Sequence, residues 1–175
     1  MVKYYKKFYD EVSKYAEGIH VLREGAAEET IEEFEKQYDM RLPANYRKWL
    51  LLNNGGELFA VPAGTILYGV REKTGDKENI FCIENNFRSQ YRAGLPSYLF
   101  AIAEENTGDI IGFDLRRTNL RDGVIVIWNH ETGEFEDEWR NFGKWLEAEM
   151  EIGSMMVIKI TIYHLYIKKY RRCDI

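Results

Sequence analysis

Few residues of this chain have the types and spacing that covalent catalysis requires. The histidines are His20, His130 and His164, and no Gly-x-Ser-x-Gly motif presents a serine nucleophile. Cys82 lies in an apolar stretch, where a buried thiol is more common than a reactive one. His130 ends a predicted strand, and we favour a water-facing polar residue there over a general base. The sequence therefore predicts no catalytic residue.

Metal and phosphate sites are not indicated either. Asp109 and Asp114 are five positions apart on one predicted strand, so their side chains point to opposite faces. Gly55 and Gly56 close a predicted helix, whereas a phosphate-binding loop opens a helix and directs its amides at the ligand. The two cysteines lack the spacing of a metal site. We predict neither a metal ion nor a cofactor.

Acidic residues are concentrated between positions 104 and 138. Ten carboxylates oppose three arginines there, which gives a formal charge of −7 over 35 residues. One interpretation is a solvated rim; the other is a face that attracts a cationic protein and raises its on-rate. Tyr98 and Trp128 are candidate aromatic anchors for such a face. The predicted partner-binding residues are Glu104, Glu105, Asp109, Asp114, Trp128, Glu134 and Glu136.

The composition is that of one folded, acidic domain. The chain has 175 residues, of which 45% are hydrophobic and 30% charged, enough for a single core. A formal net charge of −5 disfavours direct binding to nucleic acid. The first residues lack the apolar core of a signal peptide, and cysteines are few, so we expect a cytoplasmic protein without a membrane segment.

Helical and strand-like patterns follow one another along the chain. Apolar spacing predicts helices over 5–19, 27–38, 43–53, 79–92 and 142–150, with Gly55 as the left-handed residue after the third. Alternation and turn residues predict strands over 57–61, 65–70, 98–103, 109–115, 123–130 and 134–139. The later connections are too short for parallel crossovers. The predicted class is α+β, a single domain whose mostly antiparallel, twisted sheet packs with N-terminal, middle and C-terminal helices.

The last residues differ in character from the rest. From Ile152 onward, five basic residues accompany one acidic residue. Met155 to Ile167 is rich in β-branched residues and alternates in part, so it could add an edge strand, pair with a second copy or stay loosely held, and its basic end could fold over the acidic face. We divide the chain into a domain over 1–151 and an extra basic segment over 152–175, and a homodimer through this segment is one expectation.

Four stretches of the chain resemble the SUKH superfamily, in the family's order. The family's acidic helix and Asn-Gly-Gly corner correspond to EETIEEFEKQYDMRLPANYRKWLLLNNGGELF. Its central Gly-Asp strand corresponds to GLPSYLFAIAEENTGDIIGFDL. VIVIWNHETGEF and WRNFGKWLE carry the Trp-containing strand and the last aromatic helix. The resemblance covers residues 26–149, with Gly112 expected to leave room beside Trp128. The motif residues expected to shape the fold are Trp49, Asn54, Gly55, Gly56, Gly108 and Gly112.

The SUKH superfamily includes bacterial immunity proteins and a fungal regulator of cell-wall glucan synthesis. The resemblance implies an α+β domain that acts by binding and has no recognised catalytic centre. It suggests a non-enzymatic, cytoplasmic immunity protein whose acidic surface neutralises a cognate toxin, often a basic nuclease. The alternatives are a regulatory or scaffold protein in cell-wall synthesis or signalling, and a hydrolase that uses carboxylates such as Asp109 or Asp114.

Overall fold

Helices and one sheet make up the described part of the chain. The computed structural model describes residues 3–60, 64–70, 83, 94–117, 119 and 121–170, with the backbone alone for 3–4 and 164–170. The elements are α1 (Lys3–Val12), β1 (Val21–Leu22), α2 (Glu28–Gln37), α3 (Ala44–Leu52), β2 (Gly56–Leu58), β3 (Thr65–Leu67), β4 (Leu99–Glu105), β5 (Ile110–Asp114), η1 (Leu115–Arg117), β6 (Ile125–Trp128), β7 (Phe135–Trp139) and α5 (Phe142–Tyr170).

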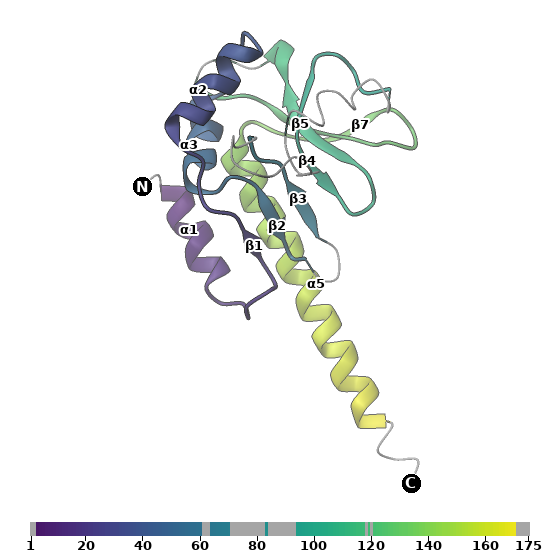
Figure 1. Cartoon of the computed structure of the whole chain (residues 1–175). Helices are drawn as coiled ribbons and strands as arrows, with labels where there is room; N and C mark the ends of the chain where they lie inside the picture. Colours follow the sequence, from purple (N-terminus) through teal and green to yellow (C-terminus); the bar gives the residue numbers. More distant parts are fainter. Residues whose placement is uncertain are drawn as a thin grey trace.

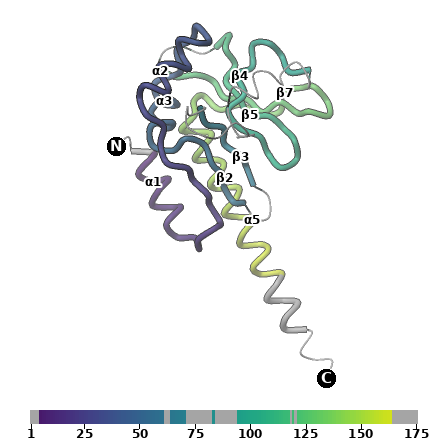
Figure 2. The backbone as a smooth tube through the Cα atoms, in the orientation of Figure 1, coloured from purple at the N-terminus to yellow at the C-terminus, as the bar shows by residue number. Residues whose placement is uncertain are grey.

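The strands of the described residues form one seven-stranded sheet in which each strand pairs with the next along the chain. Every one of these pairings is antiparallel. Figures 1 and 2 show α1, α2 and α3 gathered beside β1 and β2, while α5 starts against the sheet and its second half extends away from the body. The α+β class is confirmed. The helix predicted over 79–92 lies almost wholly outside the described residues.

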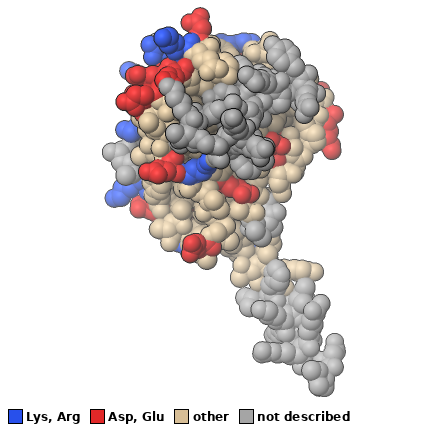
Figure 3. All heavy atoms as spheres, in the orientation of Figure 1, with Lys and Arg blue, Asp and Glu red and all other residues tan. Residues whose placement is uncertain are grey.

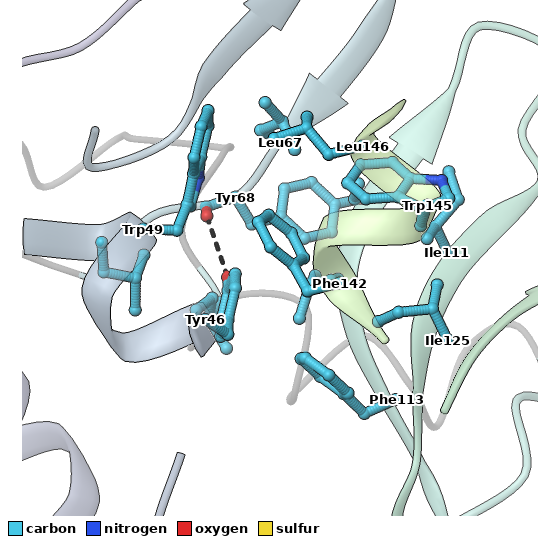
Figure 4. Close-up of a cluster of buried hydrophobic side chains, with 14 of the residues drawn as sticks. Tyr46, Trp49, Leu67, Tyr68, Ile111, Phe113, Ile125, Phe142, Trp145 and Leu146 are labelled. Carbon is cyan, nitrogen blue, oxygen red and sulfur yellow. Dashed lines mark hydrogen bonds between the residues drawn. The ribbon is translucent and has the colours of Figure 1, made fainter. Parts of the chain in front are cut away.

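The core lies between the sheet and the helices, and aromatic rings fill much of it. Figure 4 shows Phe142 of α5 close to Tyr46 and Trp49 of α3, with ring centroids 5.2 Å and 5.6 Å away. Phe113 of β5 contacts the other side of Tyr46 at 5.5 Å. Offset and edge-on pairs of this kind stabilise a core beyond the area they bury. Trp49 is fully buried within this cluster.

The Asn-Asn-Gly-Gly corner connects α3 to three strands. Asn54 is buried and exchanges two hydrogen bonds with the backbone of Val70, donating at 3.0 Å and accepting at 2.8 Å. Gly55 and Gly56 have φ angles of +84° and +137°, which glycine adopts without strain. A Cβ on Gly56 would stand 2.3 Å from the carbonyl oxygen of Val21. The close pairing of β1 with β2 therefore requires glycine at position 56.

The first helix is shorter than predicted. It ends at Val12, and the chain then turns through Gly18, whose φ is +86°, before β1. Tyr15 and Ile19, which continue the apolar spacing in the sequence, pack against the core from this turn. Apolar spacing thus identified residues that face the core but not where the helix ends.

The expected edge strand in the last segment is wrong, because residues 152–170 continue α5. A helix already formed over 142–151 extends at little cost, since each further residue adds a hydrogen bond without a new nucleus. Gly153 also permits close packing, as the Phe59 ring lies 2.1 Å from the position of a Cβ. No helix in the described part of the chain is both long and apolar enough to cross a membrane.

Candidate functional site

Two turns meet at one end of the sheet, and Asp109 connects them. Residues 106–109 join β4 to β5, and residues 129–134 join β6 to β7. The Asp109 carboxylate accepts a hydrogen bond from the backbone N–H of His130 at 3.0 Å and lies 2.9 Å from its ring Nδ1. The Thr107 hydroxyl donates another bond at 3.0 Å. Asp109 therefore fixes the second turn against the first.

These contacts also set the charge of Asp109. Partial burial opposes its ionisation, but the hydrogen bonds from His130 and Thr107 outweigh burial and hold the pKa of the carboxyl below its usual value. The neighbouring Gly108 has a φ of +95°, and the His130 ring lies 3.3 Å from where its Cβ would stand. This motif glycine serves a tight turn under an imidazole ring.

Four carboxylates from separate elements lie near one another at this end. Glu105 of β4 pairs in register with Thr65 of β3, whose hydroxyl donates to Glu149 of α5. Burial raises the pKa of Glu105, and the charges of Glu149, Asp109 and Glu136 raise it further. Burial also raises the pKa of Glu149, although the bond from Thr65 opposes it. Carboxylates are thus clustered at a place where two of them, Glu105 and Glu149, are shielded in part from water.

We call this region the acidic end. Within the described part of the chain, no salt bridge neutralises Glu105, Glu136 or Glu149. Figure 3 shows acidic atoms along the rim formed by the β6–β7 hairpin, with most basic atoms of that view on the side of α2. The residues of the acidic end are Glu104, Glu105, Asp109, Glu131, Glu134, Glu136 and Glu149.

Asp114 lies at the opposite end of β5 and is not part of this group. Its carboxylate is buried and accepts hydrogen bonds from Arg116 at 2.9 Å and 2.8 Å and from Arg117 at 2.8 Å. The bonds from Arg116 are the largest cause that lowers the pKa of Asp114, to about 2. Arg117 also binds Glu138 at 2.8 Å. The arginines of the acidic segment therefore neutralise carboxylates at this end, and Asp114 is a poor candidate for partner contact.

The predicted aromatic anchors are engaged inside the molecule. Trp128 is 4% exposed and packs with Leu99 and Val126 on the second face of the sheet. Tyr98 lies under the Arg116 guanidinium, 3.6 Å from ring centroid to Cζ. The space expected beside Gly112 is filled, because a Cβ there would stand 2.8 Å from the Leu99 side chain. Trp128 thus contributes to packing.

The remaining predicted contact residues lie on different elements, and Glu104 points to the opposite face of β4 from Glu105. Glu104 accepts a hydrogen bond from the Tyr68 hydroxyl at 2.6 Å, and Glu136 accepts one from the Asn129 amide at 2.7 Å. Glu134 is exposed in the β6–β7 turn. Sequence reasoning missed Glu149, although its spacing from Trp145 and Leu146, four and three residues earlier, marked an acid beside the buried helix face.

The chemistry of the acidic end is that of a charged binding surface. Among the described residues, no three His, Cys, Asp or Glu side chains are placed to hold a metal ion. Asp109 and His130 form a close pair, but the hydrogen bonds of Asp109 stabilise the turn that carries it. What the geometry offers is a set of carboxylates on rigid strands and one helix, able to pair with cationic groups of another molecule.

Comparison with known proteins agrees with this fold. A protein from Pseudomonas syringae pv. tomato, known from a crystal structure, is similar with a TM-score of 0.57 and 15% sequence identity, over 81% of this chain and 95% of the other. At that identity the similarity concerns the fold alone. Comparison with curated proteins gives no significant match. The model of the SMI1 / KNR4 family (SUKH-1) matches residues 25–148, and the chain therefore belongs to this family.

Proposed function

We propose that this protein is a non-enzymatic immunity protein that binds a cationic toxin through the acidic end. Proteins of its family are generally immunity or regulatory proteins that bind protein partners. The fold supplies a rigid sheet, and the acidic end supplies charge. Because the proposed toxin is met inside the producing cell, the proposal includes a cytoplasmic location.

One observation carries the proposal: the distribution of paired and unpaired carboxylates. At the far end of the sheet, Arg116 and Arg117 form ion pairs with Asp114, and Arg117 also pairs with Glu138. At the acidic end, the described residues supply no such partner for Glu105, Glu136 or Glu149. Clustered carboxylates raise one another's pKa and oppose folding, so a cluster of this kind is costly unless a cation approaches it.

A nuclease toxin is the partner whose chemistry fits best. Nucleases bind a phosphate backbone with lysine and arginine side chains, and an anionic protein surface can occupy the same groups. Complementary potentials raise the association rate, which matters for a protein that must reach a toxin before its substrate does. The toxin would contribute the aromatic or apolar anchors, since Trp128 is buried in this chain.

Charge reversal at the acidic end tests the proposal. The probe is a purified basic nuclease domain encoded beside the gene of this protein, and the variant carries Glu131→Lys, Glu134→Lys and Glu136→Lys, three exposed positions. We expect association at least about tenfold slower at low salt, a difference that shrinks as salt rises, and loss of growth protection on co-expression.

The matched control carries Glu17→Lys, Glu29→Lys and Glu33→Lys, which changes the net charge equally at exposed positions away from this end. It should bind and protect like the parent chain. Equal loss in both variants would assign the effect to net charge, and full protection by the first variant would refute the acidic end as the contact. Binding to a host protein without protection would favour the regulatory alternative.

A further inference from the structure

The second half of α5 is an apolar helix that extends from the body. Figure 1 shows it leaving the sheet and ending at the far tip of the molecule. Exposed fractions are 49% for Met155, 58% for Ile158 and 60% for Ile162. Large apolar side chains in this number are seldom left in water, because burying each one in a partner is favourable. We call residues 152–170 the arm.

One face of the arm has the spacing of a coiled coil. Glu151, Met155, Ile158 and Ile162 follow one another at intervals of four, three and four residues, and Leu165 and Lys169 continue with three and four. Alternating intervals of three and four keep residues on one stripe of a helix and are the pattern of a two-helix seam. The helix backbone runs through all six positions.

This stripe is complementary to itself when reversed. It has an acid at its first position, four apolar residues in the middle and a base at its last position. We propose that two copies of the chain associate through an antiparallel pairing of their arms. In that register Ile158 lies opposite Ile162 of the second copy, Met155 opposite position 165, and Glu151 opposite position 169. A two-fold axis produces each contact twice.

Charge selects the antiparallel direction. A parallel pair would set Glu151 against Glu151 and Lys169 against Lys169, which is unfavourable, whereas the reversed pair joins opposite charges at both ends. Glu151 is exposed and forms no ion pair with another described residue, so it is available for this contact. Lys159 lies on the flank of the stripe, about 40° around the helix from Met155, where its exposed, long side chain can keep its charge in water.

A groove beside the stripe extends the interface. It has a volume of about 380 Å³ between α1 and α5, and Met155 and Ile158 contribute to its lining together with Phe8, Leu146 and Met150. Because Met155 and Ile158 belong to both, the groove and the stripe form one continuous apolar surface on α5.

Sedimentation equilibrium of the full chain tests the pairing. The parent chain should have the mass of a dimer, and Ile158→Glu and Ile162→Glu should each give a monomer with an unchanged near-ultraviolet dichroism spectrum. The matched control is Met156→Glu, an exposed apolar residue about 160° around the helix from Ile158, which should remain a dimer. A parent chain that is monomeric at every concentration would refute the proposal.

A charge exchange tests the direction of the helices. Glu151→Lys and Lys169→Glu should each weaken the dimer roughly tenfold, and the double variant should restore it. If the double variant is no stronger than the single ones, the antiparallel pairing is wrong. Co-sedimentation with vesicles of phosphatidylglycerol and phosphatidylcholine provides a separate readout. Monomers that bind these vesicles, with Met156→Glu as impaired as Ile158→Glu, would assign the arm to lipid instead.

Discussion

At the scale of single residues, hydrogen-bond donors decide which carboxylates of the acidic segment remain charged and available. Asp114 is buried yet strongly acidic, because Arg116 and Arg117 donate to both of its oxygens. Burial and the charge of Glu149 raise the pKa of the half-buried Glu105, and a hydrogen bond from Thr107 offsets this only in part. A carboxylate thus stabilises the fold at one end of the sheet, whereas neighbouring carboxylates repel one another at the other end.

Asp114 should make stability depend on pH in the acid range. Its pKa is lowered from 3.8 to about 2 in the folded chain, so its charge stabilises the fold above about pH 4 and this contribution is lost as pH falls towards 2. We expect Asp114→Asn to lower the free energy of unfolding by about 1–2 kcal/mol near neutral pH, less than the full shift because both arginines are exposed.

Urea unfolding followed by tryptophan fluorescence measures this difference. The loss should shrink when the same titration is made at about pH 3, where the carboxyl is largely protonated in the unfolded chain and must release that proton on folding. Asp137→Asn, at an exposed position of β7, is the control and should change little at either pH. An equal loss at both pH values would mean that charge is not the cause.

Glu149 should show the opposite behaviour. Burial raises its folded pKa, so the ionised form destabilises the fold fully above the folded pKa; this penalty shrinks as pH falls through the folded pKa and is absent below the ordinary pKa. Glu149→Gln keeps an acceptor for the Thr65 hydroxyl and removes the charge. We expect a higher free energy of unfolding at neutral pH, with no difference in acid, and a lower pKa of Glu105 by NMR titration. Unchanged titration of Glu105 would show that the two carboxylates do not interact.

At the scale of elements, α5 combines two roles that change at about residue 155. Its first half packs in the core through Phe142, Trp145 and Leu146, and Gly153 accommodates the ring of Phe59. Its second half exposes apolar residues on a regular stripe. Contacts with the body include those of Ser154, whose hydroxyl lies 2.6 Å from that of Tyr15, and of Val157.

Gly153 should be required for the first role. Alanine favours a helix by up to about 1 kcal/mol relative to glycine, but a Cβ at this position would stand 2.1 Å from Phe59. We expect Gly153→Ala to destabilise the chain by about 1–3 kcal/mol, as overpacked cores do. In a Phe59→Leu background the same change should cost less. Additive losses in the double-mutant cycle would contradict the contact.

At the scale of the whole molecule, charge and apolar surface lie on different parts. The acidic end belongs to strands β4 to β7 and the first half of α5, whereas the exposed apolar stripe belongs to the arm. Binding of a cationic partner and self-association are therefore separable, and the proposed division of the chain near residue 151 can be tested.

A chain that ends after Ile158 should retain the fold and lose self-association. It keeps the contacts of Gly153, Ser154 and Val157 with the body. We expect its free energy of unfolding to change by less than about 0.5 kcal/mol, because the removed residues whose side chains the structure describes, 159–163, are mostly exposed. Its mass should be that of a monomer, and its affinity for the nuclease probe should be unchanged. A large loss of stability would place the boundary of the domain further along the chain.

Much of the fold follows from local signals in the sequence. Pro43 precedes α3, Gly55 has the predicted positive φ, and apolar alternation located the strands from β4 to β7. Such signals act within a few residues, so they predict the type and order of elements better than their ends. The family resemblance, which depends on the same residues, is confirmed over 25–148.

Tertiary structure decided which residues meet. Asp109 and Asp114 are near in sequence, but one joins the acidic end and the other pairs with arginines, because β5 carries them to opposite ends of the sheet. Glu149 joins Glu105 only because α5 crosses the sheet. The arm is a helix because it continues one already packed by Phe59 and Gly153, a constraint that alternation in the sequence could not reveal. The sequence alone thus determined local conformation, whereas long-range packing determined which carboxylates are paired with arginines and which residues contact one another.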